Sequence, residues 1–370
     1  MRLLIAPDSF KGSLTSVEVA RALAAGWTRV RPGDDVRLAP LADGGEGTLV
    51  AVEAAGGWEW REAPARDPLG RPIRARWLAR ADRTAAFVEM ATASGLSLTT
   101  AGERDPAAAS SHGTGDVVRA VLDAGIREIA IGIGGSATTD GGAGIIRALG
   151  GRVSDDLAEL DLAGLDPRLA ETRVRVACDV TNPLLGARGA AAVYGPQKGA
   201  TPSDVDALDS RLAGFADALE HATGHAERDT AGAGAAGGIG FGLLCLADRF
   251  AGLTLEPGID LVMAEAAFDG KLAAADLVIT GEGQIDAQTA FGKTALGVAK
   301  RARDEGKPCI AIGGGVTPAG IEALAAVEAI AVPVVERPQS VDEAIGAGAA
   351  PVERCAERLA RLLSVGDRPG

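Results

Sequence analysis

Glycine and acidic residues occur together in several short segments that directly follow apolar stretches of the chain. In residues 131–144, IGIGGSATTDGGAG, Ser136 and Asp140 stand among several glycines. Backbone amides with no Cβ beside them can converge on an anion in such a segment. A sharp turn alone needs fewer glycines, so the composition favours a phosphate-binding loop over a turn that only redirects the chain.

Two further segments combine glycine with acidic residues after a predicted strand. The sequence GEGQID places Glu282 and Asp286 at the carboxyl edge of a sheet, where open α/β folds bind their ligands. The sequence DGGEG presents Asp43 and Glu46 within one tight turn. Two carboxylates this close in the sequence can hold Mg²⁺, or one of them can accept a proton. For the acids of GEGQID, the alternative is a solvated loop.

Other polar residues are candidates for anion binding or proton transfer. Asp179 follows a predicted strand in ACDVTNPL, where it can be a base or a metal ligand, or can cap an Asx-type turn. Lys11 and Ser13 lie between the first predicted strand and the first predicted helix, which suits an anion, although Ser13 can also be a simple N-cap. Gln197 and Lys198 lie in PQKGAT, a loop that either binds an anion or is merely exposed.

Matches to standard nucleotide and metal motifs are weak. GIGGSA at 132–137 fits GxGxxA after a strand, but no clear helix follows it. GAGAAG at 232–237 follows no strand, and GKT at 292–294 stands too far from the preceding strand for a Walker A loop. His221 and His225 lack the glutamate of a zinc-protease motif, so we predict no metal there.

The composition excludes several classes of protein. The formal charge of the 370 residues is −13 with no long block of lysine and arginine, so nucleic acid is not an expected partner. The four cysteines lie far apart, so we predict neither a disulfide framework nor a zinc site. No apolar stretch suits a membrane helix or a secretory signal, and we therefore expect a cytoplasmic protein with no membrane partner.

The elements that must position these residues alternate between strand and helix. We predict strands at 2–7, 35–41, 276–280, 308–313 and 327–332, and helices at 13–27, 48–55, 295–305, 319–325 and 341–363. Strands from both ends of the chain then form one parallel sheet covered by helices.

The middle of the chain has a different pattern. We predict an exposed hairpin or edge at 64–77, helices at 115–124 and 144–149, and strands at 127–133 and 174–178. We interpret residues 61–270 as a second α/β domain inserted into a first domain of residues 1–60 and 271–370. The glycine-rich and acidic loops of both domains would then face one cleft.

Taken together and in order, the glycine–acid segments resemble the bacterial type I glycerate kinases. The segments are APDSFKGS, PLADGGEGT, RDPLGRP, SSHGTGD, IGIGGSATTDGGAG, ACDVTNPLLGARGAAAVYGPQKGAT, GAGAAGGIG and DLVITGEGQIDAQTAFGK, and they span residues 2 to about 300. The resemblance implies an α/β fold in which a Rossmann-like (flavodoxin-like) domain is paired with a second α/β domain. It also implies phosphorylation of D-glycerate by ATP with Mg²⁺, typically at the 2-hydroxyl.

Under this resemblance the candidate residues receive roles, because phosphoryl transfer needs positioning, charge neutralisation and one carboxylate that takes the hydroxyl proton. We predict Asp179 as the general base, with Asp43 as its rival and Lys11 as a further catalytic residue. The predicted metal ligands are Asp140, Glu46 and Glu282. The predicted substrate- and phosphate-binding residues are Ser13, Gly134, Gly135, Ser136, Asn182, Gln197, Lys198, Gly281, Gly283, Asp286 and Lys293.

The sequence leaves three questions open. The product of such a kinase can be 2-phosphoglycerate or 3-phosphoglycerate. A nicotinamide-dependent hydroxyacid dehydrogenase would use GIGGSA as its cofactor turn, and a non-catalytic regulator would bind a small acid without turnover. The chain can act as a monomer or as a homodimer.

Overall fold

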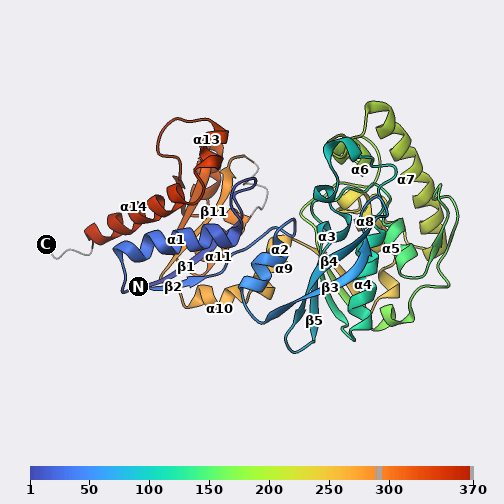
Figure 1. Cartoon of the computed structure of the whole chain (residues 1–370), viewed down its shortest axis with the longest axis horizontal. Coiled ribbons are helices and arrows are strands. Elements are labelled where there is room, and N and C mark those ends of the chain that lie inside the picture. The colour runs from blue at the N-terminus through green and yellow to red at the C-terminus, as the bar shows by residue number, and fades with distance from the viewer. Residues whose placement is uncertain (288, 290–293, 367–370) are drawn as a thin grey trace. The chain divides into compact units, whose positions relative to one another are not determined.

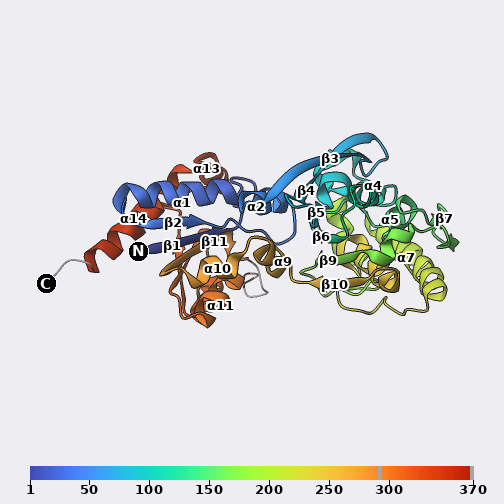
Figure 2. The same cartoon turned by 90° about the horizontal axis from the view of Figure 1, so that it is seen from below.

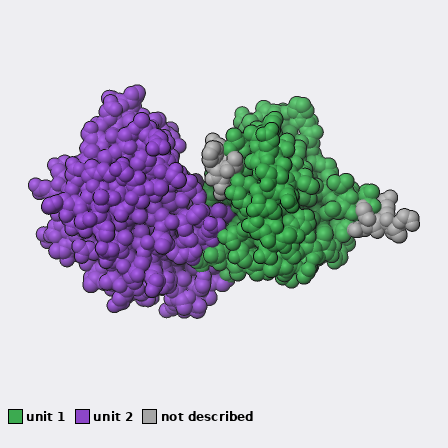
Figure 3. All heavy atoms as spheres, turned by 180° about the vertical axis from the view of Figure 1, so that it is seen from behind, with its two compact units in different colours: residues 1–43, 50–56, 262–370 green, residues 44–49, 57–261 purple. Residues whose placement is uncertain are grey.

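The chain folds into two compact units. The computed structural model describes residues 1–287, 289 and 294–366. Unit 1 comprises Met1–Asp43, Val50–Gly56 and Val262–Gly370, and unit 2 comprises Gly44–Leu49 and Gly57–Leu261 (Figure 3). Our predicted assignment of domains, with boundaries after residues 60 and 270, stays a prediction.

Unit 1 is built on a five-stranded parallel sheet in the order β13-β12-β11-β1-β2. Its strands are β1 (Arg2–Pro7), β2 (Asp35–Leu38), β11 (Leu277–Ile285), β12 (Cys309–Val316) and β13 (Ala329–Pro333). The blue N-terminal strands and the orange C-terminal strands share this sheet (Figure 1). Numbered within the sheet, the order is 2-1-3-4-5, which is that of flavodoxin-like folds. The predicted parallel sheet from both chain ends is therefore confirmed.

Helices cover both faces of this sheet. Figure 2 shows α1 and α14 on one face and α10 and α11 on the other. The helices are α1 (Ser16–Val30), α10 (Phe268–Ala273), α11 (Thr294–Asp304), α12 (Pro318–Ala325), α13 (Val341–Gly346) and α14 (Ala350–Gly366). Two more helices, α2 (Thr48–Ala54) and α9 (Gly258–Glu265), each contain a boundary between the units. The apolar stripe of α1 buries Leu23 and Trp27, as an amphipathic helix on a sheet must.

Several predicted elements of unit 1 have wrong bounds, and three of them show a local reason. Helix α1 begins at Ser16 and not at residue 13, because Thr15 supplies the capping box. Strand β2 ends at Leu38, although the Ala39 and Leu41 N–H groups still donate to carbonyls of β1, because Pro7 of β1 has no N–H for the next ladder bond. The single helix predicted at 341–363 is two helices, α13 and α14, interrupted where Gly348 takes a φ of 59°.

Unit 2 is built on a six-stranded mixed sheet in the order β10-β9-β6-β5-β4-β3. Its strands are β3 (Trp58–Arg66), β4 (Pro72–Arg80), β5 (Ala85–Glu89), β6 (Glu128–Gly132), β9 (Arg173–Ala177) and β10 (Gly252–Glu256). Strands β5, β6, β9 and β10 run parallel, whereas β3 and β4 form an antiparallel hairpin that continues antiparallel into β5. The hairpin predicted around residues 64–77 is confirmed. A separate small ribbon pairs β7 (Arg152–Val153) with β8 (Leu160–Asp161).

The four parallel strands of unit 2 end in register. Glu89, Gly132, Ala177 and Glu256 are neighbours across the last positions of β5, β6, β9 and β10. The segments that follow these residues therefore leave the sheet at one edge. Ligands of open α/β sheets bind at this carboxyl edge, so the fold gathers the glycine-rich loop after β6 and the acidic segment after β9 where a site is expected.

Six helices belong wholly to unit 2. They are α3 (Ala91–Ser94), α4 (His112–Asp123), α5 (Ala143–Ala148), α6 (Ala190–Tyr194), α7 (Pro202–Thr223) and α8 (Ile239–Cys245). Phe215 of α7 and Phe241 of α8 pack edge to face in the core, with ring centroids 6.2 Å apart. Across both units, no helix among the described residues has the length and apolar character needed to cross a membrane.

The packing of α1 on α14 predicts an unusual sign for a glycine substitution. A Cβ at Gly26 would overlap the carbonyl oxygen of Glu353. Gly26→Ala should therefore lower the free energy of unfolding by about 1–3 kcal/mol, although alanine normally stabilises a helix interior. Gly270→Ala in α10 is the matched control, because its Cβ meets no atom within 4 Å, and it should raise stability by about 0.5–1 kcal/mol. Urea unfolding measures both, and equal stability changes in the two variants would contradict this account.

Candidate active site

Asp8 is a buried carboxylate at the carboxyl end of β1 that the sequence analysis did not select. It is 6% exposed and accepts hydrogen bonds from the Ser9 backbone N–H and the Thr294 hydroxyl, both at 2.6 Å. Burial raises the pKa of Asp8 to about 6, and the nearby Asp43 raises it further, whereas the Thr294 hydrogen bond and Lys11 oppose the shift. Its position directly after the first strand was the available sequence signal.

Lys11 and Asp43 form an ion pair in unit 1. The Lys11 Nζ lies 3.5 Å from Asp43 Oδ2. Asp43 raises the pKa of Lys11, and Asp8 and Glu282 add to this effect. The structure therefore pairs two predicted residues, Lys11 and Asp43, directly, and Glu282 acts electrostatically on the same ammonium group.

We expected the segment GEGQID to follow a strand that ends at residue 280. Its residues 281–285 instead form the second half of β11, and Asp286 lies just beyond the strand. Glu282 pairs with Gly313 and Gln284 with Gly315, because β12 extends equally far. A Cβ at Gly281 would overlap the Ile312 carbonyl oxygen, so this glycine permits close strand approach. The phosphate-binding roles of Gly281 and Gly283 stay predictions.

The other predicted residues of unit 1 each have their own hydrogen-bond partners. Glu282 is 7% exposed, and its Oε1 accepts the Thr289 hydroxyl at 2.8 Å. Asp286 follows β11, and its N–H donates to Thr289 Oγ1 at 3.1 Å. The Ser13 hydroxyl donates to the Ile345 carbonyl at 3.4 Å and caps no helix. Lys293 lies outside the described residues.

In unit 2, the DGGEG turn packs directly on the glycine-rich loop. The Gly134 N–H donates to the Gly44 carbonyl at 3.3 Å. A Cβ at Gly132 would lie 2.5 Å from the Gly44 oxygen, and one at Gly134 would lie 2.6 Å from the Gly45 Cα. Gly44 itself has a φ of 84°, and its Cβ would lie 2.5 Å from the Cβ of Ala177. Because Gly44, Gly132 and Gly134 lack side chains, the turn at residues 44–45 can contact both the end of β6 with its following loop and the end of β9.

Glu89 binds the backbone of the same turn, and the sequence analysis did not select it. This 5% exposed carboxylate accepts hydrogen bonds from the Gly47 N–H at 3.2 Å and the Leu49 N–H at 3.0 Å, one to each oxygen. Burial raises the pKa of Glu89 to about 7, with a further rise from Glu46, while the backbone hydrogen bonds oppose the shift. An acidic residue at the end of an apolar strand, FVEM, was the signal available in the sequence.

Lys198 is buried and not exposed on a loop. Its side chain is 2% exposed, and the ammonium group donates to Ser136 Oγ at 2.8 Å and to the Thr138 carbonyl at 2.6 Å. Burial lowers the pKa of Lys198 to about 7, and Asp140 opposes the shift. The structure thus joins Lys198 to Ser136, both predicted to bind an anion, by a direct hydrogen bond.

Asp140 is occupied by donors from its own surroundings. Its carboxylate accepts hydrogen bonds from the Ser111 N–H and hydroxyl at 2.8 and 2.9 Å, and from the N–H groups of Gly142 and Gly144 at 3.1 Å each. These contacts close the turn that leads into α5. They give Asp140 a structural role that its glycine neighbours did not reveal, and its role as a metal ligand stays a prediction.

The remaining predicted residues of unit 2 differ in exposure. Asp179 is exposed after β9, and its Oδ1 accepts the Gly258 N–H at 2.8 Å. Asn182 donates to the Arg188 carbonyl at 2.8 Å and accepts the Tyr194 hydroxyl at 2.7 Å, so its amide braces the following loop.

Gln197 and Glu46 are both exposed. The backbone carbonyl of Gln197 accepts a hydrogen bond from Arg104 at 3.4 Å. Glu46 lies on the DGGEG turn that Glu89 holds from below. The binding role of Gln197 and the metal-ligand role of Glu46 stay predictions.

Carboxylates suited to a divalent cation are present in unit 1. Among the described residues, no three His, Cys, Asp or Glu side chains are arranged as a metal cluster. Mg²⁺ commonly takes only one or two carboxylates and completes its shell with water and phosphate oxygens. Asp8 and Asp43 meet that requirement, because the effect of Asp43 on the pKa of Asp8 reports two like charges in proximity. The residues present therefore fit Mg²⁺.

The structure disfavours a dinucleotide-binding turn at GIGGSA. That motif needs a helix N-terminus directly after its glycines. The chain instead continues through an irregular segment from residue 133 to residue 142 before α5 begins at Ala143. The geometry for the dehydrogenase alternative is absent at this loop.

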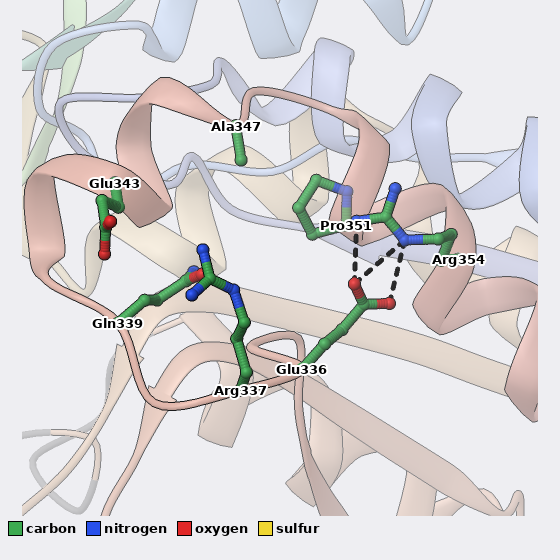
Figure 4. A pocket seen from close by; sticks show the side chains of 7 residues that line it. All are labelled: Glu336, Arg337, Gln339, Glu343, Ala347, Pro351 and Arg354. Atoms are coloured by element: carbon green, nitrogen blue, oxygen red, sulfur yellow. Dashed lines mark hydrogen bonds and ion pairs between the residues drawn. The ribbon is translucent and has the colours of Figure 1, made fainter.

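A cavity of about 220 Å³ lies in unit 1 beside the segment that joins β13 to α13 (Figure 4). Glu336, Arg337, Gln339 and Arg354 are among its lining residues. Glu336 pairs with Arg354 at 2.8 Å and with Arg358 at 2.6 Å. No predicted site residue lines this cavity, so it is not part of the candidate site.

The environment of Glu89 predicts a pH-dependent contribution to stability. Its pKa rises from 4.5 in the unfolded chain to about 7 in the folded protein, so the folded state binds more protons in this window. The contribution of Glu89 to stability should therefore fall as the pH rises from 4.5 to 7. In Glu89→Gln this pH-dependent loss should disappear, as measured by urea unfolding at several pH values. Glu159→Gln, an exposed change elsewhere in unit 2, is the control and should run parallel to the parent, and a Glu89→Gln profile that does so would contradict the argument.

Comparison with known proteins gives one consistent family. Residues 3–364 match the model of the glycerate kinase family. "Glycerate kinase" of Bacillus subtilis is 46% identical over 355 residues, covering 90% of this chain and 92% of that protein. "Glycerate 2-kinase" of Escherichia coli K12 is 40% identical, covering 100% and 99%.

A solved structure agrees with these relatives. The crystal structure of the "putative glycerate kinase 2" of Salmonella typhimurium LT2 superposes with a TM-score of 0.85 at 40% identity, and the match covers 99% of both chains. The family model spans nearly the whole chain, and both curated relatives exceed 30% identity over most of their length. The chain belongs to the glycerate kinase family.

Proposed function

We propose that this protein transfers the γ-phosphoryl group of ATP to the 2-hydroxyl of D-glycerate in the presence of Mg²⁺, giving 2-phosphoglycerate and ADP. The observation that carries the proposal is the family match over residues 3–364, together with a relative named "Glycerate 2-kinase" that aligns with the whole chain. The carboxyl ends of the parallel strands in each of the two sheets, where the predicted acids and glycines lie, support the same conclusion.

Anion binding would rely on local donors, since the protein carries a formal charge of −13. Lys11 in unit 1 and the loop at Gly134, Gly135 and Ser136 in unit 2 are the groups suited to phosphate or carboxylate oxygens. When bound, Mg²⁺ would neutralise charge on the phosphate oxygens, and Asp8 and Asp43 are the residues that would hold it. Each of these side chains is positioned by contacts already present in the fold.

The reaction also needs a group that takes a proton. The 2-hydroxyl oxygen bonds to the γ-phosphorus as the bond from that phosphorus to the bridging oxygen breaks, ADP departs, and the hydroxyl proton passes to a carboxylate. We assign this base to Asp179, which is exposed at the carboxyl end of β9. Asp43 is the rival, but its carboxylate already pairs with Lys11 at 3.5 Å and is one of the two residues that would hold Mg²⁺.

Asp179→Asn tests the assignment of the base. The asparagine oxygen can still accept the Gly258 N–H, so the fold should persist while kcat falls about 10²-fold or more. Steady-state kinetics and a thermal melt measure the two effects. Asp206→Asn, an exposed change on α7, is the control and should keep the parent rate. If Asp179→Asn folds and retains nearly full kcat, Asp179 is not the base.

The position of phosphorylation has a direct test. 2-Phosphoglycerate is consumed by enolase directly, whereas 3-phosphoglycerate must first be isomerised by a mutase. We therefore expect the enolase-coupled signal with D-glycerate and MgATP to appear without added mutase. A signal that appears only with mutase would replace the proposed product by the 3-isomer. No signal in either assay, with no ADP released, would reject the kinase proposal.

A further inference from the structure

Lys198 is a buried cation whose position in the fold is fixed. It lies at the end of a short 3₁₀ turn, Pro196–Lys198, which stops at Gly199 with a φ of 101°. A Cβ at Gly199 would lie 2.9 Å from the Arg104 carbonyl oxygen, so the backbone there is closely packed. With 2% of its surface exposed, the Lys198 side chain is directed into unit 2 and cannot reach solvent without unfolding its surroundings.

The two hydrogen bonds of Lys198 both end on the glycine-rich loop. Its ammonium group donates to Ser136 Oγ at 2.8 Å and to the Thr138 carbonyl at 2.6 Å. These partners are 62 and 60 residues away in the sequence. An ammonium group has donors and no acceptor. Ser136 Oγ must therefore accept this bond, which leaves the hydroxyl hydrogen of Ser136 to be donated elsewhere.

The backbone of the same loop is pinned on both sides of Ser136. The Leu96 N–H donates to the Gly135 carbonyl, and the Ala137 N–H donates to the Ser94 carbonyl, both at 2.9 Å. Gly135 has a φ of 76°, a left-handed conformation of the kind that turns successive N–H groups toward one concave side. The loop is thus held in one conformation by the backbone at residues 94–96 and by the Lys198 side chain.

Several donors of this pinned loop have no acceptor in the protein. Within the described part of the chain, neither the Ser136 hydroxyl hydrogen nor the N–H groups of Gly135 and Ser136 meet an acceptor. Ser136 is 7% exposed, so its own donors are poorly served by bulk water, whereas Gly135 is exposed and water can reach its N–H. Unsatisfied donors at a fixed loop are the arrangement that an anionic oxygen would complete.

We propose that an anionic oxygen of a substrate accepts hydrogen bonds from Ser136 and the Gly135–Ser136 amides, and that Lys198 is the positioning residue that makes the Ser136 hydroxyl a donor. This inference rests on the proposed function and deepens it. Lys198 acts through Ser136 and does not touch the substrate. The acceptor is either the carboxylate of D-glycerate or a phosphoryl oxygen of ATP, and the experiment separates these two sources.

The variants are chosen to separate positioning from folding. Ser136→Ala removes one hydroxyl, and Lys198→Met replaces the ammonium by an apolar group of similar length. Ser210→Ala is the control, because the Ser210 hydroxyl is exposed on α7 and lies outside the glycine-rich loop. It should leave the kinetic constants at their parent values and keep or raise the melting temperature.

The readouts are KM for D-glycerate, KM for ATP, and Kd for D-glycerate, ADP and inorganic phosphate by calorimetry. Loss of one hydrogen bond to a charged group should weaken binding about 10-fold or more. We expect Ser136→Ala to raise the KM and Kd of one substrate by this factor while leaving the other unchanged, which identifies the source of the anionic oxygen. Lys198→Met should raise the same constant, and the double variant should be no worse than either single variant.

Each outcome decides the proposal. Additive effects in the double variant, or parent-like KM and Kd in a folded Ser136→Ala, overturn it. If Lys198→Met does not fold, Ser136→Ala with the Ser210→Ala control still decides whether the Ser136 hydroxyl binds the anion. If the parent shows no phosphoryl transfer but its binding of D-glycerate, ADP or phosphate depends on Ser136, the proposed function fails while the assignment of the anion-binding donor stands.

Discussion

The close approach of two glycine backbones is the constraint on which the candidate site of unit 2 depends. Gly44 accepts a hydrogen bond from Gly134, and no side chain can be added at Gly132 or Gly134 without striking residues 44–45. Because backbone touches backbone, the DGGEG turn is held against the end of β6. Glu89 then satisfies the amides at the start of α2, which fixes the orientation of the turn. The high glycine content of these segments is explained first by packing and only then by ligand binding.

Three buried ionisable groups stand close to this contact, and each is satisfied differently. Asp140 accepts hydrogen bonds from four N–H and O–H donors, and Glu89 accepts them from two amides. Lys198 donates to two oxygen acceptors. Burying charge costs free energy unless such partners are present, and a satisfied network contributes little net stability. What it contributes is a single geometry, since every alternative loop conformation would leave one of these groups unpaired. A preorganised loop is also what transition-state stabilisation requires.

The sequence predicted the parts of this structure that repeat along the chain. Apolar strands followed by helices gave the parallel sheet of unit 1, together with the hairpin and the strands β6 and β9 of unit 2, whereas β5 and β10 were not predicted. Glycines after strands gave the segments of the candidate site. It did not reveal Asp8 or Glu89, because their importance comes from burial and from donors that are distant in the sequence. It selected Lys198 and Ser136 as separate candidates but could not show that the Lys198 side chain is buried and bonded to Ser136. The extension of β11 through GEGQID depends on β12 lying beside it, which a local pattern does not contain.

An acidic protein that binds acidic substrates must overcome electrostatic repulsion, and the strength of that repulsion depends on distance. Charges beyond about 8 Å are largely screened at physiological salt, so a formal charge of −13 spread over the surface opposes approach only weakly. Within hydrogen-bond distance the balance reverses, since a few oriented N–H and O–H groups in a poorly hydrated loop interact strongly with one anionic oxygen. Lys198 adds a positive charge below that loop without exposing it, so it can favour an anion on one side of Ser136 and attract none elsewhere. A buried cation that works through a hydroxyl therefore gives local affinity and leaves the acidic surface unchanged.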